Sequence, residues 1–266
     1  MKTGLFFATI FACASMPALA EVSLTESTFT EIIQQANVVN ANDKSAAPAR
    51  VNEVFKAPDL VRTGTASRIE MTAPDKTITR VGANSVFTFA TGGRDILLER
   101  GSVLFHAPAG AGGGAIKYHG TAAAVLGTTE LAAVLPDGSF KILDLEGKVK
   151  VTLKNLLSVE LQPGQMVVVS PDGNTFGPVL NFNLGRLLPH LLLIVGFSDP
   201  LSSLPLIQAA SQGQNHEIAG GQGSDHFATL LMAEYGLDLT PDSELQKWNL
   251  PTQPQIRISP TAGYHP

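Results

Sequence analysis

The side chains that could carry out metal or acid–base chemistry are widely spaced along this chain. Its histidines are His106, His119, His190, His216, His226 and His265. No two of them have the i, i+4 spacing that places two metal ligands on one face of a helix. A site joining His106 and His119 would need the strands 102–106 and 115–119 to pair. We favour surface histidines at strand ends and expect no metal.

A glycine-rich loop, Gly-Ala-Gly-Gly-Gly-Ala at 110–115, matches the loose form of a dinucleotide-binding fingerprint. Such a loop must leave a strand and enter a helix whose N-terminus holds the pyrophosphate. Here Ile116-Lys117-Tyr118 follows and indicates a strand, so a long flexible hairpin is the better interpretation and no cofactor is expected. Gly112 and Gly113 remain candidates for a recognition surface, because binding function concentrates on loops held by a rigid scaffold.

Nucleophilic catalysis finds no support in the sequence, which lacks a Gly-x-Ser-x-Gly motif. Asp75, Asp137 and Asp172 each follow a proline, which is turn chemistry. A glycosidase pair of Glu99 with Glu130 or Glu146 stays open, although any two acids could be nominated in this way. We therefore predict a protein without enzymatic activity and with no catalytic residues.

Four charged residues, Arg62, Arg68, Glu70 and Arg80, lie in a stretch where apolar and charged side chains alternate. Together they could form a recognition surface. The alternative is a cross-strand charge ladder on a solvated sheet face, in which Arg68 or Arg80 pairs with Glu70. We favour the ladder, because short charged alternation is ordinary on a half-exposed sheet.

The elements that must position these residues are short strands. Turn signals recur about every 8–12 residues between 51 and 169, which is typical of an all-β fold. The pattern predicts strands at 68–72, 77–81, 86–90, 95–98, 102–106, 115–119, 122–126, 129–135, 139–145, 148–153, 158–161 and 166–169. Residues 21–39 fit either a helix or a first strand, and we favour the strand. Residues 40–50 indicate a surface loop.

The character of the chain changes after residue 173. A leucine-rich helix is predicted at 183–195 with a break at Pro189, and another at 199–210 with Asp199 as its N-cap. A Gly/Gln-rich linker at 212–223 precedes an amphipathic helix with Phe227, Leu230, Leu231 and Tyr235 on one stripe. The longest apolar run in the first helix, 191–195, is far shorter than the roughly 20 residues of a membrane span.

The first twenty residues have the pattern of a cleavable signal peptide: Lys2, an apolar stretch, and Ala18-Leu19-Ala20 before the cut. The alternative is a lipoprotein anchor at Cys13, the only cysteine. Either way the sequence predicts an exported protein, periplasmic or at the cell surface. The net charge of −5 and the absence of a basic cluster argue against nucleic acid as a partner.

An ordered series of segments closely resembles the FecR domain, a β-rich extracytoplasmic module. These segments are 60–71, 79–84, 98–103, 125–129, 145–149 and 161–166, and the resemblance covers about 51–171. It implies a compact β-coil or roll of many short strands. FecR regulators of sigma factors place a cytoplasmic segment and a membrane span ahead of this module, and this chain departs from that layout.

The predicted organisation is a signal peptide at 1–20, a mainly β FecR-like domain at 21–180, a partly helical region at 181–250 and a disordered tail at 251–266. The predicted function is that of a non-enzymatic binding or structural module of the cell envelope, with a protein or glycan as partner. The first alternative is a soluble accessory of FecR-type signalling that docks onto a transporter or sensor. An envelope hydrolase is the second.

Overall fold

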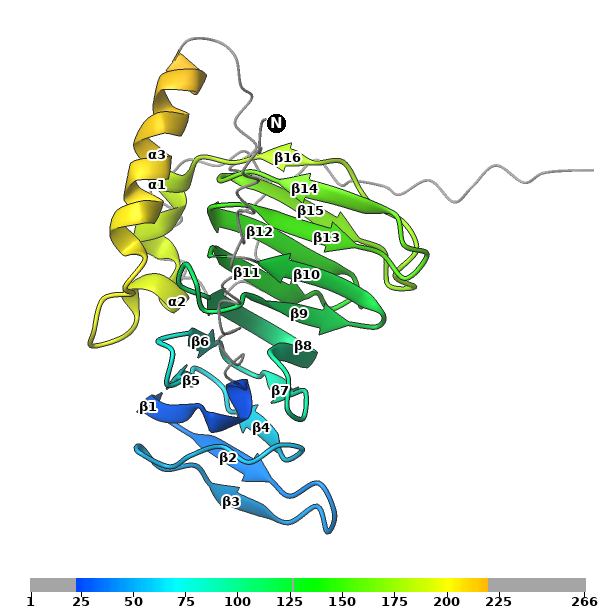
Figure 1. Ribbon diagram of the computed structural model, residues 1–266, viewed down its shortest axis with the longest axis vertical. Coiled ribbons are helices and arrows are strands. Elements are labelled where there is room, and N and C mark those ends of the chain that lie inside the picture. The colour runs from blue at the N-terminus through cyan, green and yellow to red at the C-terminus, as the bar shows by residue number, and fades with distance from the viewer. Residues whose placement is uncertain (1–22, 126, 220–266) are drawn as a thin grey trace, which may run out of the picture.

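The computed structural model describes residues 23–125 and 127–219 of the 266. Figure 1 shows short strands stacked from β3 at one end to β16 at the other, with helices α1, α2 and α3 along one side. A 3-10 turn, η1, spans Leu24–Glu26. The strands are β1 Thr28–Ile33, β2 Ala36–Val39, β3 Ala46–Pro48, β4 Leu60–Thr63, β5 Arg68–Thr72, β6 Ile78–Val81, β7 Val86–Phe89, β8 Asp95–His106, β9 Gly114–Tyr118, β10 Thr121–Val125, β11 Thr129–Val134, β12 Phe140–Glu146, β13 Val149–Thr152, β14 Ser158–Leu161, β15 Gln165–Val169 and β16 Leu180–Asn181.

The strands form two sheets that share β8. Sheet A has the order β1-β5-β6-β8-β11-β12-β15-β16, and sheet B has the order β3-β2-β4-β7-β8-β9-β10-β13-β14. Neighbouring strands are antiparallel except β8 and β9, which are parallel. The fold is therefore mainly β, as the sequence predicts.

Strand β8 changes sheets at Gly101, whose φ of +87° is unfavourable for any residue with a Cβ atom. A Cβ added there would lie 2.1 Å from Ser85 Oγ and 2.5 Å from Ser85 Cα. Residues before Gly101 pair with β7 and β9 in sheet B, and residues after it pair with β6 and β11 in sheet A. The sequence analysis predicts two strands here, and they are the two halves of β8.

Two apolar cores fill the molecule. The first lies between the sheets and includes Phe29, Phe87, Phe105 and Phe140. The second lies on the outer face of sheet A, where Leu104, Leu131, Leu143 and Met166 meet apolar side chains of the helical region. Side chains on one strand alternate between the two cores, because successive residues of a strand point to opposite faces.

The helical region consists of α1 Leu184–Leu187, a 3-10 turn η2 at Leu188–His190, α2 Leu192–Val195 and α3 Leu204–Ala219. The predicted break near Pro189 is present. The helix start predicted at Asp199 is wrong, since α3 begins at Leu204. A helix that began at Asp199 would hold Pro205 in its interior, whereas in α3 Pro205 lies in the first turn, where proline is tolerated. Helix α3 also continues to Ala219 through part of the predicted linker. No helix among residues 23–125 and 127–219 is long and apolar enough to cross a membrane.

Of the other expectations from the sequence, some agree with the structure and some do not. Residues 28–33 form strand β1, as favoured, whereas the surface loop predicted at 40–50 contains β3. The pairing of 102–106 with 115–119 that a site joining His106 and His119 would need does not occur, since β9 pairs with the first half of β8. The signal peptide, the amphipathic helix after 223 and the tail at 251–266 lie outside the described residues.

Candidate functional site

The predicted charge pair between Glu70 and Arg80 exists, but it is not solvated. Glu70 on β5 lies opposite Arg80 on β6. Arg80 Nε donates to Glu70 Oε2 at 2.8 Å, and Nη2 lies 2.7 Å from the same oxygen. The Arg80 side chain is fully buried and Glu70 nearly so. These two residues therefore lie beneath another part of the chain and are not on an exposed recognition surface.

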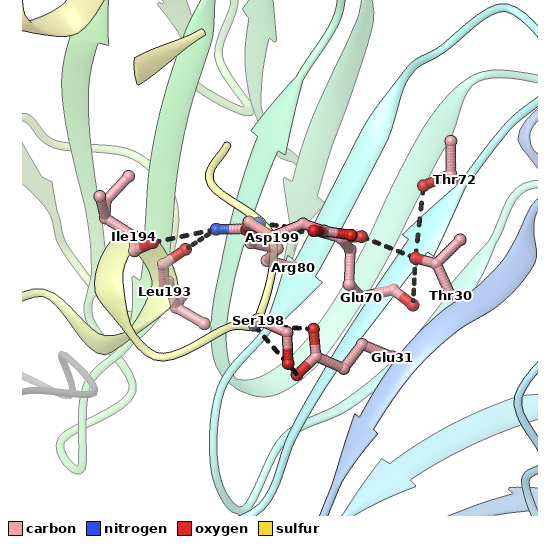
Figure 2. A network of polar contacts seen from close by, with 9 residues as sticks. All are labelled: Thr30, Glu31, Glu70, Thr72, Arg80, Leu193, Ile194, Ser198 and Asp199. Carbon is pink, nitrogen blue, oxygen red and sulfur yellow. Dashed lines mark hydrogen bonds and ion pairs between the residues drawn. The ribbon is translucent and has the colours of Figure 1, made fainter. Parts of the chain in front are cut away.

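The helical region covers this pair. Arg80 Nη1 donates to the carbonyls of Leu193 (3.2 Å) and Ile194 (3.1 Å), and Nη2 donates to the carbonyl of Asp199 at 2.7 Å (Figure 2). The Phe197 ring stacks on the guanidinium, with 4.3 Å between its centroid and Cζ. Carbonyl groups at the end of a helix carry partial negative charge, so a buried cation suits this position. We call these contacts the Arg80 clasp.

Two further polar contacts join the helical region to sheet A. Glu31 on β1 accepts from the backbone N–H of Ser198 at 3.0 Å and from its hydroxyl at 3.0 Å (Figure 2). Ser203, just before α3, lies with its Oγ 2.8 Å from the hydroxyl of Thr129 on β11. The outer face of sheet A is thus closed by apolar packing and by hydrogen bonds.

The remaining charged candidates are separated. Arg68 on β5 is half-buried beside Gly196, whose added Cβ would lie 3.0 Å from Arg68 Nε. Arg62 is exposed on β4 in sheet B. The structure does not bring the predicted set of Arg62, Arg68, Glu70 and Arg80 together on one open surface.

The glycine loop is anchored rather than a free hairpin. It connects the parallel strands β8 and β9, so the hairpin expected here is wrong. Buried Arg94 donates from Nε to the carbonyl of Gly113 at 2.7 Å, and from Nη1 to Asp75 and Nη2 to Thr77 at 2.7 and 2.6 Å. Gly113 is buried by these contacts, whereas Gly112 remains exposed.

The two histidines that flank this loop lie in different surroundings. His106 is buried on sheet A, with Nδ1 3.0 Å from the Thr129 hydroxyl, and burial lowers its pKa. His119 is exposed in the turn between β9 and β10. Among the described residues no three metal-binding side chains are grouped.

A buried carboxylate pair is the feature that sequence reasoning missed. Glu130 on β11 lies opposite Asp144 on β12, and both point between the sheets, on the side of Ala132 and Ile142. All four carboxylate oxygens are buried without a partner in hydrogen-bond geometry among the described residues. Burial raises the pKa of Asp144 to about 7, and burial with the nearby Asp144 charge raises the pKa of Glu130 well above its usual value.

The structure does not bring together the carboxylates of the glycosidase arrangement considered from the sequence, Glu99 with Glu130 or Glu146. Glu99 is exposed on β8, Glu130 is enclosed between the sheets, and Glu146 lies beside Thr129 on the opposite side. The alternation of β11 and β12 could have hinted at the pair, because Glu130 and Asp144 occupy positions where the pattern requires apolar side chains.

The open part of the molecule is the end of sheet B. Strand β14 pairs only with β13 among the described strands, so its other edge is free. The turn before it carries Leu156 and Leu157, which are 83% and 62% exposed and are the most exposed large apolar residues in the described chain. At the other end of the sheet, edge strand β3 ends in Pro48, which cannot donate to an added strand.

Residues 59–150 match the sequence model of the family FecR protein. The match confirms the predicted resemblance to the FecR domain, and residues 59–150 are called the FecR domain below. This FecR domain runs from β4 to β13 and therefore includes the Arg80 clasp residues of sheet A, the glycine loop and the buried carboxylate pair. Strand β14 and the whole helical region follow it.

Two crystal structures of a proposed anti-sigma factor from Parabacteroides distasonis ATCC 8503 are similar to the chain that carries this FecR domain. Each is 19% identical in sequence, with TM-scores of 0.41 and 0.40. Each likeness covers 46% of this chain and 59% of the other, so the chain spans less than two thirds of those proteins. No curated protein matches the chain.

Proposed function

We propose that this chain is a non-catalytic accessory of FecR-type cell-surface signalling, exported to the cell envelope, which docks onto a transporter or sensor protein. The FecR domain supports the signalling role, and the leader-like pattern of residues 1–20 supports export. The binding element in this proposal is the free edge of β14 with Leu156 and Leu157, called here the β14 edge.

One contrast carries the proposal. The outer face of sheet A is covered by the helices of the same chain, whereas the β14 edge presents two adjacent exposed leucines next to backbone groups that no other described strand pairs. Sheet edges are normally shielded by charge, proline or covering segments, because they can pair with another strand. An edge that combines exposed leucines with open backbone groups suits an added strand from a partner.

The backbone geometry identifies which groups would pair. Leu153 N–H donates to the Leu157 carbonyl at 2.8 Å, which makes these two residues a hydrogen-bonded pair. Because paired and unpaired positions alternate along an antiparallel ladder, the N–H groups of Ser158 and Glu160 point away from β13. A partner strand would receive hydrogen bonds from these two residues.

The test uses the full chain in its native cells, with a photo-reactive amino acid placed at position 157 or, as a control, at Ala46 on the opposite edge strand. We expect a discrete cross-linked protein from position 157 and none from position 46. The second change Ser158→Pro removes an outward N–H and should abolish the adduct, while Ala46→Pro should leave it intact. Equal adducts at both positions, or an adduct that survives Ser158→Pro, would contradict docking at the β14 edge.

A further inference from the structure

The turn between β9 and β10 places a residue with a side chain in the left-handed region of the backbone. His119 and Gly120 join the paired residues Tyr118 and Thr121 and have φ values of +45° and +85°. Positive φ at both central residues is the signature of a type I′ turn, which prefers Asn-Gly or Asp-Gly. A residue other than glycine with a positive φ is uncommon and is a reason to look for function.

The His119 ring is the outer, exposed member of a stacked pair of rings. It lies on the Tyr118 ring with centroids 4.1 Å apart and planes 12° apart, and Tyr118 in turn contacts Phe140 at 5.5 Å. Tyr118 is buried and His119 is exposed, so the pair presents a flat aromatic face on a rigid base.

This aromatic face borders a hollow of about 590 Å³, lined by His119, Gly120, Lys154, Pro171, Asp172 and Asn174. A second hollow of about 550 Å³ adjoins it across the shared residues His119, Gly120 and Lys154, and extends towards Leu97 and Thr121. The hydroxyl oxygen of Thr121 is buried without a partner among the described residues. Cavities of this size accommodate small organic ligands.

The polar groups around the first hollow carry charges of both signs, and hydrogen bonds hold the carboxylate in place. Asp172 accepts from the Ser170 hydroxyl at 2.5 Å and from the Asn174 backbone N–H at 3.1 Å, which orients its carboxylate. The stem of Lys154 packs on Gly120, where an added Cβ would lie 3.2 Å from Lys154 Cγ. One cation and one anion at the same rim favour a neutral ligand rich in hydroxyl groups over a strongly charged one.

We propose that this hollow is a saccharide-binding site. The C–H face of a pyranose ring would lie on the exposed face of the His119 imidazole, whose π electrons attract the weakly positive hydrogens. Lys154 would donate to sugar hydroxyls, while Asp172 and the Asn174 amide oxygen would accept from them. The site uses residues other than those of the β14 edge and does not depend on the proposed signalling role.

The decisive variant is His119→Asn. The substitution removes the imidazole ring, and the fold should be kept because asparagine is favoured in this turn. Binding of cellobiose and of N,N′-diacetylchitobiose to the full chain is followed by amide shifts in NMR spectra. We expect saturable shifts at residues 117–121 and 172–174 with at least one disaccharide, and a loss of affinity of at least about tenfold in His119→Asn.

The matched control is Lys76→Asn, which makes the same kind of change at another exposed position with positive φ, +70°. It should leave the shifts unchanged. Lys154→Met keeps the apolar stem, and we expect it to weaken binding while the unfolding midpoint stays the same. Absence of saturable shifts with both disaccharides, or equal binding by His119→Asn and the unmodified chain, would overturn the proposal.

Discussion

Arg80 is buried in the FecR domain, yet most of its hydrogen bonds go to the helical region. Its guanidinium reaches Glu70 on the neighbouring strand and three backbone carbonyls between residues 193 and 199. A buried charge costs free energy unless it is fully paired. The burial of Arg80 is therefore compensated by Glu70 and the three carbonyls acting together. One side chain thereby links the helical region to sheet A, in addition to the apolar core and the contacts of Glu31 and Thr129.

We expect Arg80→Met to lower the free energy of unfolding by about 3–5 kcal/mol, because Glu70 is left as a nearly buried charge without its cation. Urea unfolding measures the change. The exposed Arg62→Met variant should stay within about 0.5 kcal/mol of the unmodified chain. A loss for Arg80→Met no larger than that of this control would show that the clasp adds nothing to stability.

Glu130 and Asp144 make stability depend on pH in an unusual direction. Their pKa values are raised in the folded state, so the folded protein binds more protons than the unfolded chain. Their contribution to stability therefore falls as pH rises from about 4 to about 7, by about 1.4 kcal/mol for every tenfold difference in proton affinity between the folded and unfolded states. Below about pH 4 both states are protonated and the penalty disappears.

Asp144→Asn should consequently flatten the fall in stability between pH 4 and pH 7, as followed by thermal unfolding at a series of pH values. Asp43→Asn is the control of opposite sign. Hydrogen bonds from Ser45 lower the pKa of exposed Asp43, so its contribution is present at neutral pH and is lost as pH falls. If the Asp144→Asn curve ran parallel to that of the unmodified chain, the buried carboxylate would not be the source.

At the scale of elements, β8 decides how the sheets meet. It belongs to sheet B before Gly101 and to sheet A after it, and Ser85 lies against the glycine where a side chain would be. The hydroxyl of Ser85 also accepts from the Ser102 N–H at 3.0 Å. The change of sheet therefore depends on a residue without a Cβ atom.

Gly101→Ala should destabilise the protein by about 2–5 kcal/mol, since it adds both a backbone penalty and a clash with Ser85. Gly92→Ala is the matched control, because Gly92 also has a positive φ, +68°, but no atom lies within 4 Å of its added Cβ. That variant should lose only about 1–2 kcal/mol. Equal losses for the two variants, measured by urea unfolding, would show that contact with Ser85 does not matter.

At the scale of the whole molecule, the helical region behaves as a third layer of one fold. Leu104, Leu131 and Leu143 are fully buried only because the helices cover the outer face of sheet A. Sheet A and the helical region share the second apolar core, which is continuous between them. The boundary predicted at residue 180 separates types of secondary structure and does not separate cores.

A chain that ends at Asn181 should therefore aggregate or bind a hydrophobic dye, because it exposes the apolar outer face of sheet A and removes the acceptors of Arg80. A chain that ends at Ala219 keeps every described element and should unfold cooperatively. Light scattering and denaturant titration distinguish the two. A monomeric, cooperatively folded chain ending at Asn181 would show that the sheets are stable without the helices.

The strands of the FecR domain could be predicted because each depends on local signals. Alternation such as Val149-Lys150-Val151 and turns such as Pro136-Asp137-Gly138 fix strand identity within a few residues. Two short strands escaped prediction: β3 lies in the segment expected to be a surface loop, and β4 is not among the predicted strands. With three and four residues, they are too short to show a clear alternation. Pairing is a long-range property, so the parallel contact between β8 and β9 had no local signal.

The candidate sites also combine features that follow from local sequence with features that depend on long-range contacts. The attraction between Glu70 and Arg80 follows from their spacing on adjacent strands, but their burial does not, because the covering residues lie more than a hundred positions later. The hollow beside His119 and the free β14 edge also depend on which hairpins become neighbours.

The sequence by itself determined the β character, the turn positions and the FecR resemblance, since period-two alternation and turn residues act over a few positions. Only the tertiary structure decided which sheet face is covered, which edge is open and which charges are buried. These outcomes depend on contacts between distant segments. Burial of apolar side chains stabilises such contacts, and burial is not directional, so an apolar pattern alone does not specify which segments meet. The arrangement of the strands and helices in space, rather than the residue types alone, decides which contacts form.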